Sequence, residues 1–126
     1  MSNEDGRSGI RCLVGKSLNP MKSAFIGRWK ITEMEQWDQD YVDMEEPGHI
    51  TLEKRGSGSF HFGCVDLALD WRYEAAIGRV DFTFDGSDED DRVGGRGWAK
   101  IEGKQLVGQI VFHLGDESGF KARKRR

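Results

Sequence analysis

The feature that most limits how this chain can fold is a ten-residue stretch, 65–74, in which apolar and polar side chains alternate. The apolar set is Val65, Leu67, Leu69, Trp71 and Tyr73, and the set between them is Asp66, Ala68, Asp70, Arg72 and Glu74. Successive side chains of a β-strand point to opposite faces of its sheet, so a period of two predicts a strand with one buried and one wet face. Such strands are typical of antiparallel sheets.

Seven further segments are also predicted to be short strands, separated by turns. They span 25–32, 49–54, 59–64, 80–84, 97–102, 105–114 and 119–123. The acidic run 85–91 is expected to form a loop. Within the strand 105–114 the inward side chains are expected to be Leu106, Ile110, Phe112 and Leu114. About eight short strands at this spacing indicate a barrel or a sandwich.

Composition agrees with a small barrel. The chain has 126 residues, 37% of them hydrophobic and 33% charged, and it holds 17 glycines but two prolines. The length suits one domain, and many glycines with few prolines indicate tight turns and bulges rather than linkers. Met34, Trp37, Tyr41 and Met44 repeat at helical spacing. We therefore predict a mainly all-β, antiparallel up-and-down barrel of about eight strands, with one short helix at 34–44 after the first strand.

The two ends of the chain differ from its middle. Residues 1–23 are rich in Ser, Gly and charge and are expected to form a flexible arm, with Met21 as an alternative start. Residues 24–124 form the predicted barrel domain, and 125–126 a basic tail. The first residues lack the charged and apolar regions of a signal peptide, and no apolar run approaches the roughly 20 residues that cross a membrane. A cytoplasmic location is expected.

Charge is unevenly distributed along the chain. The net charge is −3, but the last six residues hold five basic groups and no acidic one. The first 120 residues therefore carry 14 basic against 22 acidic side chains. An acidic body argues against nucleic acid as a partner, because phosphate binding requires a basic face.

The first and last strands carry residues known from lipocalin-like barrels. Gly27-Arg28-Trp29 resembles the lipocalin opening motif, in which a tryptophan plugs one end of the barrel. In those barrels an arginine of the closing strand stacks over that tryptophan, and Arg123 holds the matching place in this chain. The resemblance thus implies a barrel-closing pair, Trp29 and Arg123, and closure itself requires the first and last strands to pair.

A longer resemblance extends from Gly27 to Lys124, about four-fifths of the chain. Its motifs are Gly27-Arg28-Trp29-x-Ile31-x-Glu33-Met34-Glu35-x-Trp37-Asp38-x-Asp40, Phe60-x-Phe62-Gly63, Gly95-Arg96-Gly97-Trp98-Ala99 and Phe112-His113-x-Gly115-Asp116. In these the chain is similar to an uncharacterised family of small bacterial proteins, some of them carried on mobile gene cassettes. No activity is established for that family, so the resemblance bears on the fold alone.

Sites of known chemistry are not recognisable in the sequence. His61 and His113 lie between aromatic-face residues and are expected to point the other way, toward solvent. The histidines and Cys12 and Cys64 lack ligand spacing, and the acidic run lacks the EF-hand pattern, so neither a metal nor another cofactor is predicted. Phosphate-loop and nucleophile-elbow motifs are missing too. An acid–base barrel enzyme using Asp, Glu or His is the third of three hypotheses, and it names no catalytic residue.

The first hypothesis is a barrel that binds a small apolar or aromatic molecule. The segment 33–46 holds seven carboxylates together with Trp37 and Tyr41, and in lipocalin-like and fatty-acid-binding barrels this segment covers the mouth. Its candidate ligand or partner surface is Trp37, Asp38, Asp40 and Tyr41. The alternative is an amphipathic plug with a buried aromatic stripe. Thirteen large aromatic residues could fill so small a barrel, so any cavity should be small.

The second hypothesis is a protein-interaction module that acts as a homodimer. Val107 and Val111 fall on the strand face opposite Leu106 and Ile110. If Trp98 points inward, Ala99 and Ile101 of the neighbouring strand would face outward beside the two valines. This predicts an apolar patch of Ala99, Ile101, Val107 and Val111 on the outside of a barrel that should be polar there. A second copy or the N-terminal arm would cover it.

Overall fold

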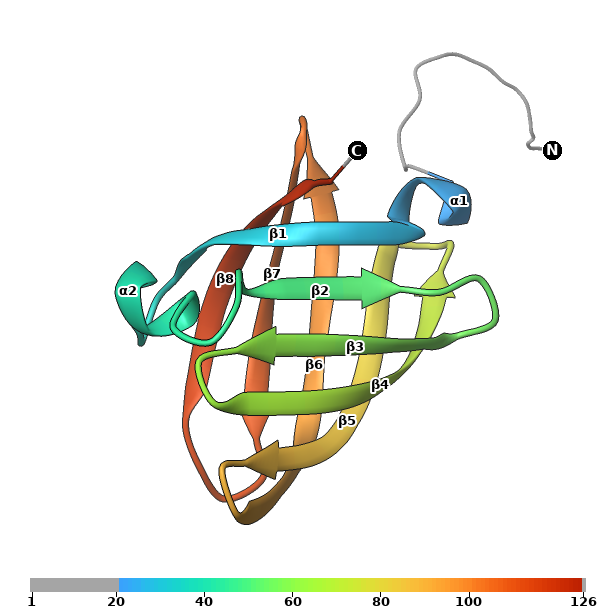
Figure 1. Cartoon of the computed structure of the whole chain (residues 1–126). Coiled ribbons are helices and arrows are strands. Elements are labelled where there is room, and N and C mark those ends of the chain that lie inside the picture. The colour runs from blue at the N-terminus through green and yellow to red at the C-terminus, as the bar shows by residue number, and fades with distance from the viewer. Residues whose placement is uncertain (1–20, 126) are drawn as a thin grey trace, which may run out of the picture.

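The structure, a computed structural model, describes residues 21–125, within which eight strands close into one antiparallel barrel (Figure 1). The strands are β1 (Gly27–Met34), β2 (His49–Leu52), β3 (Ser57–Phe62), β4 (Val65–Glu74), β5 (Arg79–Asp88), β6 (Asp91–Glu102), β7 (Gln105–Phe112) and β8 (Glu117–Lys124). Each strand pairs with the next along the chain, and β8 pairs with β1. The predicted small antiparallel up-and-down barrel is confirmed.

Two short helices lie beyond opposite ends of β1, as Figure 1 shows: α1 (Lys22–Phe25) and α2 (Gln39–Val42). Phe25 is fully buried, and its carbonyl accepts a hydrogen bond of 2.9 Å from Trp29 Nε1. The barrel domain therefore starts with α1, two residues before the predicted boundary. The predictions for 1–20, including the arm and Cys12, fall outside the described residues. Neither helix is long and apolar enough to cross a membrane.

The helix predicted at 34–44 is much shorter than expected. Met34 is the last residue of β1, and α2 begins only where the Asp38 carboxylate caps it by accepting from the Tyr41 N–H at 3.0 Å. It ends at Asp43, whose side chain turns to accept from the Gly48 N–H at 2.8 Å. Side-chain bonds to the backbone thus hold the rest of the β1–β2 connection out of helical conformation.

Barrel closure is achieved, but not by the predicted pair. Trp29 lies opposite Lys124 in the β1–β8 register, and Arg123 is exposed opposite Lys30. Lys124 Nζ lies 4.5 Å from the centre of the Trp29 ring. The reason is strand parity: Ala122 of β8 is buried, so Lys124, two residues further, continues the inward face while Arg123 points outward.

The acidic run 85–91 is not a loop. β5 continues to Asp88 and β6 begins at Asp91, so Glu89 and Asp90 alone form the turn. Backbone pairing of Asp88 with Val65 on one side and Asp91 on the other outweighs the low β-propensity of aspartate.

Large and small side chains alternate inside the barrel. Three inward glycines have no room for a side chain, because a backbone carbonyl oxygen of the neighbouring strand and a phenylalanine ring both lie where the Cβ would be. An added Cβ would lie 2.8 Å from Phe84 Cζ at Gly95, 2.5 Å from Phe82 Cζ at Gly97 and 2.8 Å from Phe120 Cζ at Gly108. This part of the interior is therefore filled by aromatic rings rather than open.

The same packing reverses the predicted faces of β6. Ala99 is fully buried and Ile101 packs against the core, whereas Trp98 points outward. An inward indole at this height would meet the rings of β5, which leave room there only for small residues. The predicted outward placement of Ala99 and Ile101 is therefore wrong. Val107 and Val111 are half-buried on the face opposite Leu106 and Ile110, as predicted.

Candidate functional site

The end of the barrel away from α1 forms a mouth. It is built by the β1–β2 connection with α2 and by the turns that follow β3, β5 and β7. A hollow of about 550 Å³ lies there. It is lined by Trp37, Tyr41, Val65, Asp88, Asp91, Arg92, Val93, Gly94, Phe112, His113, Leu114, Gly115 and Asp116.

The floor of the mouth is aromatic. The Trp37 ring lies 4.8 Å from the ring of Phe62 and 6.4 Å from that of Phe112, and Phe112 in turn lies 5.3 Å from Phe84. Tyr41 packs edge-on against Phe62 at 6.4 Å between ring centres. The apolar floor of the mouth is therefore continuous with the aromatic core of the barrel.

The Tyr41 side of the mouth packs against a turn that contains a glycine. Gly63, in the turn between β3 and β4, has a φ of +57°, and any Cβ there would collide with the Tyr41 ring. A glycine therefore both makes the tight turn and lets the Tyr41 ring lie on the backbone. The Tyr41 hydroxyl accepts a long hydrogen bond, 3.4 Å, from the Cys64 N–H.

Charge at the mouth is mainly negative. Asp88, Asp91 and Asp116 line the hollow, with Arg92 as its basic counterpart. Burial raises the pKa of Tyr41, and the nearby charges of Asp88 and Glu89 raise it further. The mouth therefore has both a negative potential and an aromatic floor.

Of the four residues predicted as a surface, the structure brings Trp37 and Tyr41 together in the mouth lining. Asp38 and Asp40 are exposed on α2 and its cap, outside the lining. Leu114, predicted to point inward, is instead 95% exposed at the rim, with a φ of +57°. β7 ends at Phe112, so Leu114 no longer follows the alternation of the strand.

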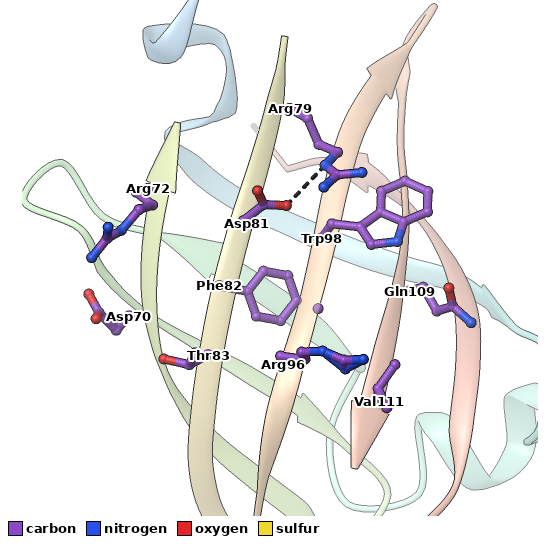
Figure 2. Close-up of a pocket in the computed structure, with 11 residues that line it drawn as sticks. Asp70, Arg72, Arg79, Asp81, Phe82, Thr83, Arg96, Trp98, Gln109 and Val111 are labelled. Carbon is purple, nitrogen blue, oxygen red and sulfur yellow. Dashed lines mark hydrogen bonds and ion pairs between the residues drawn. The ribbon is translucent and has the colours of Figure 1, made fainter. Parts of the chain in front are cut away.

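A second recess, of about 510 Å³, lies on the outer wall over β4 to β7 (Figure 2). Thr83 forms part of its floor, between Asp70 and Arg96 in the strand register. Asp81 is paired with Arg79 at 2.9 Å, and the Arg79 guanidinium lies 5.4 Å from the Trp98 ring centre. Charges of both signs line this recess, and it lacks the convergent negative potential of the mouth.

A third group of polar side chains lies on the outside of β2 to β4, under the β1–β2 connection. His61 points outward, as predicted, but is only 4% exposed. Its Nδ1 lies 2.6 Å from Asp66 Oδ1, and its ring stacks on that of His49 at 5.6 Å. The predicted solvent exposure of His61 is wrong because these neighbours and the connection cover it.

Cys64, the described cysteine, lies beside this group. Burial and the negative charges of Glu45 and Glu89 raise the pKa of its thiol. A thiol that holds its proton more tightly is a poor nucleophile at neutral pH. The surroundings of Cys64 therefore do not favour covalent catalysis.

Comparison of the chain with protein-family models, with curated proteins and with solved structures finds no match. The resemblance to the family of small bacterial proteins and the lipocalin-like character of the barrel therefore stay predictions. The candidate sites of the described residues are the mouth, the outer-wall recess and the polar group around His61. Of these, the mouth combines a concave shape, an apolar floor and mainly negative polar groups, and an apolar cavity with a few polar groups is the usual composition of a small-molecule site.

Proposed function

We propose that the protein binds a small organic cation with an apolar or aromatic body at the mouth of the barrel. The observation that carries this proposal is the aromatic floor of Trp37 and Phe112 beneath the carboxylates of Asp88, Asp91 and Asp116. A cation over an aromatic face gains roughly 0.5–2 kcal/mol depending on its desolvation. The carboxylates add attraction that weakens as salt is added.

Size supports the same kind of ligand. The hollow of about 550 Å³ lies within the range of roughly 300–1,000 Å³ that is usual for small-molecule sites. Rings fill the barrel interior around Gly95, Gly97 and Gly108, so the ligand rests on the core rather than entering it. A compact amine fits this geometry better than a long acyl chain does.

The test uses three probes with one aromatic body and different charges: naphthylmethylamine, naphthylmethanol and naphthoate. Isothermal titration should give the order amine, alcohol, acid in affinity. Asp88→Asn with Asp91→Asn should weaken amine binding about two- to thirty-fold, since each partly exposed ion pair is worth roughly 0.2–1 kcal/mol. The matched control is Asp70→Asn with Asp81→Asn on the outer wall, which removes the same charge.

Two results would contradict the proposal. Naphthoate binding as tightly as the amine would show that the negative potential of the mouth does not select the ligand. An equal loss of affinity in the outer-wall control would show that net charge, rather than the mouth, attracts the amine.

A second function, association of two copies, rests on a different observation. Trp98, Val107 and Val111 all point outward on the neighbouring strands β6 and β7, with arginines around them. Tryptophan and arginine are enriched in the energetic centres of protein interfaces. We therefore propose this outer wall, with Trp98 in place of Ala99 and Ile101, as a homodimer contact.

Light scattering at high micromolar concentration tests this contact. Val107→Lys with Val111→Lys should convert a dimer into a monomer, whereas Ala68→Lys, on the outer face of β4, should leave it dimeric. A wild-type protein that is already monomeric refutes this second function. It would not affect the proposal for the mouth.

A further inference from the structure

The group around His61 joins three parts of the chain that are separate in sequence. His61 of β3 lies opposite His49 of β2 and opposite Asp66 of β4 in the strand registers. Glu45 reaches the same place from the β1–β2 connection. One nitrogen of His61 and one carboxylate oxygen each of Glu45 and Asp66 lie within 4.8 Å of one another.

The imidazole of His61 is held by the protein on one side only. The side chain is 5% exposed, and Nδ1 contacts Asp66 Oδ1 at 2.6 Å. Its Nε2 is buried and has no hydrogen-bond partner among the described residues. A buried ring nitrogen without a partner is an unsatisfied polar group. An imidazole nitrogen that carries no proton can bind a metal ion.

The two carboxylates suit a site that can open and close. Asp66 and Glu45 are both exposed, and the surroundings of Cys64 place the Glu45 carboxylate within hydrogen-bonding reach of that thiol. Ligands around a tetrahedral ion at roughly 2.0–2.2 Å lie about 3.4 Å apart. The pair of His61 Nδ1 and Asp66 Oδ1, now at 2.6 Å, would open slightly, and the ligand atoms that are farther apart, up to 4.8 Å, would move closer. The rotatable bonds of the exposed Glu45 and Asp66 side chains can supply both movements, while buried His61 stays in place.

We propose that His61, Glu45 and Asp66 form a binding site for a divalent transition-metal ion such as Zn²⁺. The ion binds one ring nitrogen of His61 that carries no proton, the single proton of the neutral ring remains on the other nitrogen, and one carboxylate oxygen each of Asp66 and Glu45 provides the other two ligands. One imidazole nitrogen with two carboxylates favours Zn²⁺, Co²⁺ or Ni²⁺ over Ca²⁺ and Mg²⁺, which prefer oxygen ligands alone.

The location gives such an ion a route to the surface. His61 and Asp66 line a third recess of about 500 Å³ on the outer wall, which also borders His49 and Ser59. The site is independent of the mouth, because none of its three ligands belongs to the mouth lining. A failure of the metal proposal would therefore leave the proposed amine binding untouched, and the reverse also holds.

The test is titration of the full chain, without an affinity tag, with Zn²⁺ and with Co²⁺. Cys12→Ser is present in every sample, because that thiol lies outside the described residues and could bind Zn²⁺ itself. We expect one equivalent of Zn²⁺ to bind and to raise the melting temperature. Bound Co²⁺ should produce the visible absorption bands that are typical of a complex with a low coordination number.

Glu45→Gln and Asp66→Asn should each weaken Zn²⁺ binding about 10–100-fold, and neither removes a buried side chain. Asp70→Asn is the matched control, since it removes an exposed carboxylate from the same face of β4. The proposal is overturned if the parent protein binds no Zn²⁺ or Co²⁺ at high micromolar concentration. It is also overturned if Glu45→Gln and Asp66→Asn bind as the parent does, or if Asp70→Asn loses as much affinity.

Discussion

Gly97→Ala tests whether the barrel interior is filled, on which the position of the ligand site depends. The new Cβ would lie 2.5 Å from Phe82 Cζ and also against the Gln109 carbonyl oxygen. Carbon atoms in normal contact are about 3.5–4.0 Å apart, so the Phe82 ring must move by roughly 1 Å in a close-packed core. Overpacking of this kind costs about 1–3 kcal/mol.

For a domain of this size the cost corresponds to a fall in Tm of about 5–20 °C. Urea unfolding, followed by far-UV circular dichroism, gives the free-energy change directly. The control is Gly94→Ala on the same strand, where the nearest atom to an added Cβ is 3.3 Å away and no ring is involved. Its effect should stay within about 0.5 kcal/mol.

A double variant separates the ring from the backbone contact. With Phe82→Leu already present, Gly97→Ala should cost less than in the parent, because the ring has gone while the Gln109 carbonyl remains. If Gly97→Ala proves neutral in the parent, the interior has free space, and the reasoning that keeps the ligand at the mouth is wrong.

Three further predictions concern the ends of the barrel. Lys124→Ala should destabilise the fold by roughly 0.5–2 kcal/mol by removing the cation over Trp29, while Arg123→Ala stays within about 0.5 kcal/mol in thermal melts. Leu114→Gly should raise stability by about 1 kcal/mol, because Leu114 is 95% exposed and adopts a left-handed conformation; an unchanged or lower Tm would show that the conformation is not strained. For Asp43, burial opposes ionisation, but hydrogen bonds from Gln39 and Gly48 and the charge of Lys30 lower its pKa below 3.8 overall. A carboxyl whose pKa is lower in the folded state stabilises the fold at pH values above 3.8, and this stabilisation is lost as the pH falls through the folded-state pKa. Asp43→Asn should therefore make the stability of the fold depend less on pH at acid pH.

The fold could be predicted because its signal is local and repeated. In 65–74 every second side chain is apolar, and Leu67, Leu69 and Trp71 are buried as this pattern requires. Trp98 alone could not predict which residues of β6 point inward, because a single large residue indicates the inward face less reliably than the pattern of its neighbours. Gly95, Gly97 and Ala99 are spaced by two and lie opposite Phe84, Phe82 and Val80 of β5. This spacing of small residues was the available signal.

The candidate sites differ in the same way, because only residues close in sequence could be predicted to lie together. Trp37 and Tyr41 lie four residues apart in one connecting segment, so their common place at the mouth could be expected, although Trp37 precedes α2. The cluster of Glu45, His61 and Asp66 could not, since it depends on a strand register and on the path of a connection. Lys124 illustrates a smaller step of the same kind: buried Ala122 sets its parity, and burial becomes known only with the fold.

The two ends of the barrel have opposite charge, and this has a consequence for how a ligand reaches the mouth. Lys22, Lys124 and Arg125 lie at the end of the barrel that carries α1, while Asp88, Glu89 and Asp116 lie at the mouth. A charge distribution of this kind orients an approaching cation toward one end and raises its local concentration there. The association rate of an amine should therefore fall as salt is added, whereas the dissociation rate, which depends on the aromatic contacts of Trp37 and Phe112, should change little. If salt changed only the dissociation rate, the electrostatic attraction would act in the bound complex and not during the approach of the amine.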